Sequence, residues 1–124
     1  MSKAVVCVVD DNSSVRGFVC TVLERFGCTI LTAENASGAL ELIRGFRDHI
    51  DMLFTDVEMP PGMDGVSLCR IVQTERPRTA LLVASTGYVK DLPHNSVFLN
   101  KPFTRKDLLH KAQEALASSA LTVI

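Results

Sequence analysis

The segment Ala4-Val-Val-Cys-Val-Val9, followed at once by Asp10 and Asp11, decides the fold. Six consecutive apolar residues predict a β-strand that protein covers on both faces, as in a parallel sheet. The run is too short to span a bilayer, and it stops at two aspartates, which excludes a signal peptide. We therefore expect a soluble, cytoplasmic chain whose first strand ends in two carboxylates.

Strand-like and helix-like segments alternate beyond this first strand. Strands are predicted over residues 4–9, 28–33, 52–55, 81–85 and 96–99. Asn12 or Ser13 can cap the first helix, Asn35 the second, and Thr104 with Asp107 forms a capping box for the last. The strand over 28–33 is the most polar and suits an edge position. This alternation predicts an α/β fold with a five-stranded parallel sheet and right-handed crossovers.

One connection is shorter than the others. Only residues 86–95 separate the fourth and fifth strands, and Pro93 interrupts them. A parallel crossover usually needs a dozen or more residues. We therefore expect the fourth helix of this fold to be shortened to a single turn or absent.

Length and composition limit the remaining possibilities. The chain has 124 residues, a formal net charge of −1, 47% hydrophobic and 22% charged residues. These values predict one globular domain over 1–124, and they argue against disorder and nucleic-acid binding. The order of strand-like and helix-like segments indicates a core of about 4–117 and a tail of 118–124. The four cysteines lie in apolar segments without metal-ligand spacing, so they are expected to be core thiols in a reducing compartment.

Three acids follow buried strands. Asp10 and Asp11 close the first strand, and Asp56 closes the third. In an open parallel sheet, ligands bind beyond the carboxyl ends of the strands, so these carboxylates meet there if the two strands are neighbours. Their mutual repulsion would be relieved by a hard divalent cation, Mg²⁺ or Mn²⁺. The alternative, that the acids are only solvated caps, fits less well with three acids at two strand ends.

Two further strand ends supply groups that a phosphate needs. Thr86 and Gly87 follow the fourth strand and offer a hydroxyl and a backbone N–H, and Lys101 follows the fifth and offers an ammonium. Taken singly, Thr86 is more often a turn residue and Lys101 a surface lysine. Together with the acids they predict a site for phosphoryl transfer to Asp56.

These motifs, each at a strand end, resemble those of the receiver domain of two-component response regulators. They are Val9-Asp10-Asp11, Phe54 to Pro60, Met63-Asp64-Gly65, Thr86-Gly87-Tyr88 and Lys101-Pro102-Phe103. The resemblance covers residues 4–117 approximately. It implies a flavodoxin-like, doubly wound five-stranded sheet of order 2-1-3-4-5. The loop 59–63 is one residue longer than in most receivers and is similar to that of receivers in hybrid histidine kinases; a single-domain regulator is the other possibility.

The resemblance implies a role for each acid. Asp56 is expected to accept a phosphoryl group from a phosphohistidine. Asp11, Asp56 and the backbone carbonyl of Glu58 are expected to bind Mg²⁺ directly, and Asp10 through water. Beyond phosphorylation and dephosphorylation of Asp56 itself, the chain is not expected to be an enzyme.

The resemblance also implies a switch. Thr86 is expected to move onto the phosphoryl group, Gly87 to contact it through its backbone, and Lys101 to pair with it across a cis bond to Pro102. Phe98 matches the switch aromatic that fills the space left by Thr86. Phosphorylation would thus change the conformation of the surface around Phe98.

The expected partner is a sensor histidine kinase or a histidine phosphotransferase. The partner is expected to dock on apolar residues near the site, and the candidates are Val15, Pro102 and Phe103. Core packing explains Phe103 equally well. Nucleic-acid and membrane partners are not expected. Because the fourth helix is reduced, no dimer is expected through the face that this helix forms in the family.

Three other functions remain open at this point. A degenerate receiver could serve only as a binding scaffold. A phosphatase of the haloacid dehalogenase class needs a second aspartate two residues after the nucleophile, where this chain has Glu58. A flavodoxin-like cofactor binder needs a phosphate loop after the first strand, where Asp10 and Asp11 would repel a flavin phosphate.

Overall fold

A five-stranded parallel sheet forms the centre of the molecule. The computed structural model describes residues 3–123, with side chains up to Ala117. The strands run in the order β2-β1-β3-β4-β5, which confirms the predicted flavodoxin-like topology and places the polar strand β2 at an edge. Their bounds are β1 (Val5–Val9), β2 (Thr29–Ala33), β3 (Met52–Asp56), β4 (Ala80–Ser85) and β5 (Ser96–Asn100).

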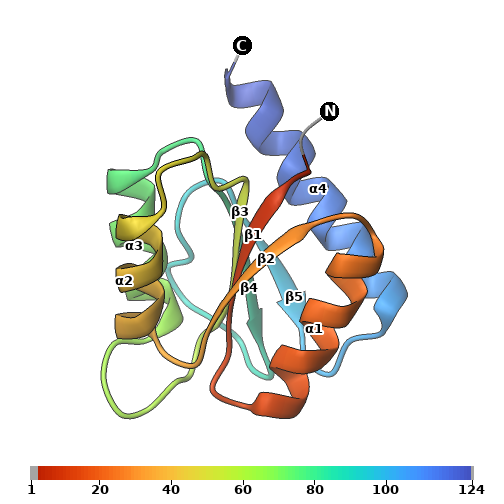
Figure 1. The fold of residues 1–124 in the computed structure, drawn as a ribbon. Coiled ribbons are helices and arrows are strands. Elements are labelled where there is room, and N and C mark those ends of the chain that lie inside the picture. The colour runs from red at the N-terminus through yellow and green to blue at the C-terminus, as the bar shows by residue number, and fades with distance from the viewer. Residues whose placement is uncertain (1–2, 124) are drawn as a thin grey trace.

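Helices cover both faces of this sheet (Figure 1). They are α1 (Ser13–Arg25), α2 (Ala36–Gly45), α3 (Gly65–Glu75) and α4 (Arg105–Val123). Helices α1 and α4 lie on one side, and α2 and α3 on the other. Neighbouring strand residues point to opposite faces, so Phe54 joins the core under α1 and α4 whereas Leu53 joins the core under α2 and α3. Both faces of β3 are buried, as its apolar sequence predicts.

The predicted caps fix where the helices begin. The Asn12 side chain accepts hydrogen bonds from the backbone N–H groups of Ser14 and Val15. Asn35 accepts one from Gly38 N, and Thr104 and Asp107 bond reciprocally across the first turn of α4. These bonds satisfy N–H groups that the first turn of a helix leaves without a partner.

The connection between β4 and β5 contains no helix over residues 86–95, all of which the structure describes. Side chains of α3 hold this segment instead: the Arg70 guanidinium donates to Asp91 O at 2.5 Å, and Gln73 Nε2 donates to His94 O at 2.7 Å. Leu92 packs against the core under α2 and α3. The prediction that the fourth helix is shortened or absent is confirmed, and it is absent here.

The last helix is longer than the sequence indicates. Helix α4 continues to Val123, through most of the segment 118–124 that we expected to be a tail; Ile124 lies outside the described residues. Among the helices of the described part of the chain, none is both long and apolar enough to cross a membrane.

Candidate functional site

Three carboxylates converge where β1 and β3 end. The two strands are hydrogen-bonded neighbours, with Val9 opposite Thr55, so the residues that follow them meet at one edge of the sheet. Carboxylate oxygens of Asp10, Asp11 and Asp56 lie within 4.8 Å of one another. The structure therefore brings together the three acids that the sequence places at strand ends.

Lys101 joins the acids from the end of β5. Its Nζ lies 2.9 Å from Asp10 Oδ2 and 3.1 Å from Asp56 Oδ1. The Asp10 side chain is fully buried, and the Lys101 and Asp56 side chains are 14% and 10% exposed. The ammonium is largely removed from water here, so its two ion pairs are screened less than surface pairs. The Lys101–Pro102 bond is cis, as the resemblance implies.

Burial and charge together set the protonation of the pair. Burial raises the pKa of Asp56; the hydrogen bond and charge of Lys101 oppose this, whereas the charges of Asp10 and Asp11 add to it, and the pKa stays above its usual value. Burial lowers the pKa of Lys101, but its hydrogen bonds to Asp10 and Asp56 and their charges outweigh burial and raise it overall. Lys101 therefore remains a cation beside a carboxylate that is costly to ionise.

The turn after β1 fixes Asp10 in place. The backbone N–H of Asn12 donates to Asp10 Oδ1 at 2.9 Å, while Lys101 occupies the other carboxylate oxygen. The guanidinium of Arg16 donates to the backbone oxygen of Asp10 at 2.7 Å. Sequence reasoning did not identify Arg16, because a lone arginine on a helix carries no motif.

A close backbone contact fixes Asp56 from the other side. Val57 N donates to Ala84 O at 3.0 Å, and Gly65 N donates to Val57 O at 2.8 Å. A Cβ atom on Gly65 would lie 1.9 Å from the backbone oxygen of Asp56, so only glycine fits at this position. The sequence motif contained Gly65, but nothing in its spacing revealed this contact. Glu58, whose backbone carbonyl is a predicted ligand, is exposed in the loop that follows.

The predicted phosphate-binding residues lie beside this cluster. Thr86 is exposed and shares the lining of a cavity with Lys101. Gly87 N donates to Ser85 Oγ at 3.2 Å. Phe98 is half-buried, and it lines a second cavity of about 380 Å³ together with Thr86 and Gly87. The predicted switch pair thus borders one hollow over the segment 86–95.

An apolar cavity of about 360 Å³ opens next to Lys101. Val15, Phe18, Pro102 and Phe103 contribute to its wall, which includes all three predicted docking residues. Phe103 also packs in the core: its ring centroid lies 6.1 Å from that of Phe54 and 6.2 Å from that of Phe18. Phe103 therefore both packs in the core and lines the cavity that is the predicted docking surface.

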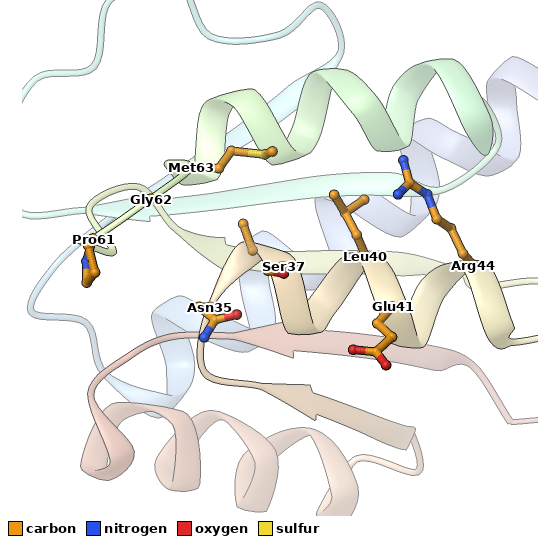
Figure 2. Close-up of a pocket in the computed structure, with 9 residues that line it drawn as sticks. Asn35, Ser37, Leu40, Glu41, Arg44, Pro61, Gly62 and Met63 are labelled. Carbon is orange, nitrogen blue, oxygen red and sulfur yellow. The ribbon is translucent and has the colours of Figure 1, made fainter.

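A larger cavity, of about 660 Å³, lies between α2 and the loop before α3 (Figure 2). Asn35 and Ser37 border it from the start of α2, and Gly62 and Met63 from the loop. Arg44 lies at its far end, where its guanidinium makes two hydrogen bonds to the Glu75 carboxylate. None of the predicted site residues lines this cavity.

The donor set of the acidic cluster fits a hard divalent cation. Mg²⁺ prefers oxygen ligands and is usually held by one or two carboxylates with several waters. Asp11 is exposed to solvent and Asp56 partly so, which leaves room for such waters. No sulfur or imidazole ligand belongs to the cluster, so softer transition metals are not favoured.

Comparisons with known proteins agree with this geometry. A family model described as the response regulator receiver domain matches residues 6–113. The response regulator receiver protein CpdR of Brucella abortus is 26% identical over 121 residues, which cover 92% of this chain and 98% of that protein. The sensor kinase CckA of the same organism is 32% identical over 121 residues, covering 92% of this chain but 13% of the kinase.

The DNA-binding transcriptional regulator NtrC of Escherichia coli is 28% identical over 123 residues. The chain spans about a quarter of the length of the NtrC proteins that it matches.

Solved structures share the fold over nearly the whole chain. A CheY-like receiver domain protein from Methanospirillum hungatei has a TM-score of 0.87 at 21% identity, covering 98% of this chain and 99% of that one. The chemotaxis response regulator CheY4 of Vibrio cholerae has a TM-score of 0.81 at 27% identity, covering 93% and 100%. The phosphatase and flavin-binding alternatives find no support among these relatives.

Proposed function

Because the chain belongs to the response regulator receiver domain family and so to phosphorelay signalling, we propose that Asp56 is its phosphoryl acceptor. The observation that carries this proposal is the position of Lys101 Nζ, which contacts Asp10 and Asp56 while Asp11 lies in the same cluster. A buried lysine between two carboxylates at the carboxyl edge of a parallel sheet suits phosphoryl chemistry better than packing.

The reaction transfers one phosphoryl group. A carboxylate oxygen of Asp56 forms a bond to phosphorus as the P–N bond of a donor phosphohistidine breaks. The electron pair of that bond stays on the imidazole nitrogen, which takes up a proton. Since the aspartate must be ionised to attack, its raised pKa in the cation-free chain opposes the reaction, and a bound divalent cation would favour the ionised form.

Asp11, Asp56 and the backbone carbonyl of Glu58 are the proposed direct ligands of Mg²⁺ or Mn²⁺, with Asp10 acting through water. When bound, the cation neutralises charge on the transferring phosphoryl group. Lys101, which follows β5 at the same edge of the sheet, is proposed to pair with the oxygens of this phosphoryl group. Its two carboxylate partners already hold the ammonium in place, so little reorganisation is needed.

The phosphorylated state is then read by the segment after β4. Phosphorylation adds about −1.5 to −2 units of charge and strong acceptor oxygens. We propose that the Thr86 hydroxyl and the Gly87 N–H donate to these oxygens, the Gly87 N–H in place of its hydrogen bond to Ser85 Oγ. Movement of Thr86 changes the wall of the hollow that it shares with Phe98, which couples the site to the surface over residues 86–95.

Receiver domains interact with sensor kinases, and we propose a sensor histidine kinase or a histidine phosphotransferase as the donor. The apolar cavity formed by Val15, Phe18, Pro102 and Phe103 lies beside Lys101 and supports docking there. We also propose a cytoplasmic location, because all four cysteines are free and a reducing compartment keeps them so.

Incubation with acetyl phosphate and Mg²⁺, followed by intact-protein mass spectrometry, tests the proposal. The wild-type chain should gain one phosphoryl group, and Asp56→Asn should gain none. Asp48→Asn is a matched control, because it removes an exposed carboxylate in the loop before β3, away from the cluster. A phosphoryl adduct that persists on Asp56→Asn would remove Asp56 from its proposed role.

A further inference from the structure

Of the two neighbouring carboxylates of Asp10 and Asp11, only that of Asp10 is held by hydrogen bonds. Both carboxylate oxygens of Asp10 accept hydrogen bonds, from Asn12 N and Lys101 Nζ. The Asp11 side chain is exposed, and no hydrogen bond or ion pair of the described residues involves its carboxylate. Yet an oxygen of this carboxylate lies within 4.8 Å of oxygens of the other two acids.

Nothing in the side chain of Asp11 explains this position. Three carboxylates repel one another, and an exposed one can relax outward into water at little cost. The constraint must therefore come from the backbone. Arg16 contacts this backbone: it is a half-buried residue in the first turns of α1, and its guanidinium donates to the backbone oxygen of Asp10 at 2.7 Å.

The oxygen that Arg16 binds belongs to the peptide plane from which Asp11 departs. A bond to this oxygen resists rotation of the plane, and the α1 backbone, capped by Asn12, fixes the residue that makes the bond. We infer that Arg16 is a positioning residue that presets Asp11 for a divalent cation. This inference rests on the proposed function, because it assigns a role within the same cation site.

Charge alone makes the opposite prediction. A guanidinium close to the acidic cluster repels a divalent cation, so removing it should strengthen cation binding if only charge matters. If Arg16 positions Asp11, its removal should weaken binding, because groups that orient metal ligands typically contribute about 10- to 100-fold to affinity. The direction of the change therefore separates the two effects.

Calorimetric titration with Mg²⁺ alone measures this direction. Arg16→Met should weaken binding about 10-fold. Arg16→Lys keeps the charge but not the planar guanidinium, and it should weaken binding less. Arg25→Met removes the same charge from the exposed far end of α1 and should leave the affinity unchanged. Thermal unfolding without Mg²⁺ shows whether each variant is folded.

The inference is overturned if the Arg16→Met variant binds Mg²⁺ as tightly as the wild-type chain or more tightly. If this variant does not fold, Arg16→Lys decides: weaker binding supports the positioning role, and wild-type affinity contradicts it. A wild-type chain that binds no Mg²⁺ contradicts the proposed cation site itself and this inference with it. At saturating Mg²⁺ the phosphorylation of Arg16→Met should approach the wild-type level.

Discussion

Gly65 shows how a single residue shapes the site. Its missing side chain lets α3 begin against the backbone of Asp56, where a Cβ atom would lie 1.9 Å from the Asp56 oxygen. Gly65→Ala must push this backbone away, so we expect a loss of about 3 kcal/mol in the free energy of unfolding. Urea denaturation measures this loss.

Gly17→Ala is the matched control. Gly17 lies inside α1, and a Cβ atom there would meet no atom within 4 Å. Alanine should therefore stabilise the chain by about 0.5–1 kcal/mol through the lower entropy of the unfolded state. Equal effects of the two substitutions would show that the close approach at Gly65 is not real.

Asp56 makes the stability of the chain depend on pH. Burial is the main cause of its raised pKa, so in the absence of Mg²⁺ the protonated form stabilises the fold at low pH. This contribution is lost as the pH rises through the raised pKa, because the folded state then holds a costly carboxylate.

Asp56→Asn removes that cost. Without Mg²⁺, the variant should be more stable than the wild-type chain at pH 7, and the difference should shrink as the pH falls through the raised pKa of Asp56 toward the ordinary pKa of a carboxyl group. Thermal unfolding across this pH range checks the trend. A variant that is less stable at pH 7 would show that the charge of Asp56 helps to hold Lys101 and stabilises the fold.

Sequence reasoning predicted the convergence of residues whose chemistry is unusual at a strand end. Asp10, Asp11 and Asp56 were predictable because acids rarely follow buried strands, and Lys101 because it ends another strand. It could not reveal that Lys101 contacts Asp10 as well as Asp56, since this depends on side-chain reach across the sheet. Arg16 and the contact at Gly65 were missed because both act through the backbone.

At the scale of the elements, the caps of α1 and α2 should contribute equally to stability, but only the cap of α1 should affect phosphorylation. Asn12 and Asn35 each cap a helix, but only the backbone N–H of Asn12 also donates a hydrogen bond to the Asp10 carboxylate. Asn12→Ala and Asn35→Ala should each cost about 1 kcal/mol in the free energy of unfolding. We expect only Asn12→Ala to slow phosphorylation by acetyl phosphate, because loss of its cap loosens the turn that carries Asp10 and Asp11.

Measurement of both quantities for both variants checks this expectation. The rate at which the phosphorylated mass accumulates gives the reactivity, and urea denaturation gives the stability. A slower rate for Asn35→Ala, with Asn12→Ala unaffected, would contradict the assigned role of the β1–α1 turn.

The strands and helices were predictable to within a few residues, since apolar runs and capping residues mark them locally. The missing helix between β4 and β5 was predictable from the length of residues 86–95 alone. The bonds that replace it were not: Arg70 and Gln73 reach this segment from α3, more than a dozen residues away in sequence. The continuation of α4 to Val123 was also missed, because the apolar pattern that marked this helix stops at Leu116.

Activation of the whole molecule should produce no dimer through the face that the fourth helix forms in the family. The resemblance to receivers implies that a full helix after β4 contributes to this face, and here an irregular segment over residues 86–95 replaces it. Size-exclusion chromatography with Mg²⁺ and beryllium fluoride, a phosphoryl mimic, should therefore show the elution volume of the free chain. A shift to the volume of a dimer would contradict this expectation.

We propose that four strand ends gather around one reactive aspartate, Asp56. Borohydride reduction of the phosphorylated chain tests it most directly, because an aspartyl phosphate becomes homoserine, which peptide mass spectrometry locates. The account predicts homoserine at residue 56 alone, and none when Mg²⁺ is removed by a chelator before phosphorylation. Homoserine at residue 10 or 11, or modification that does not need the cation, would contradict it.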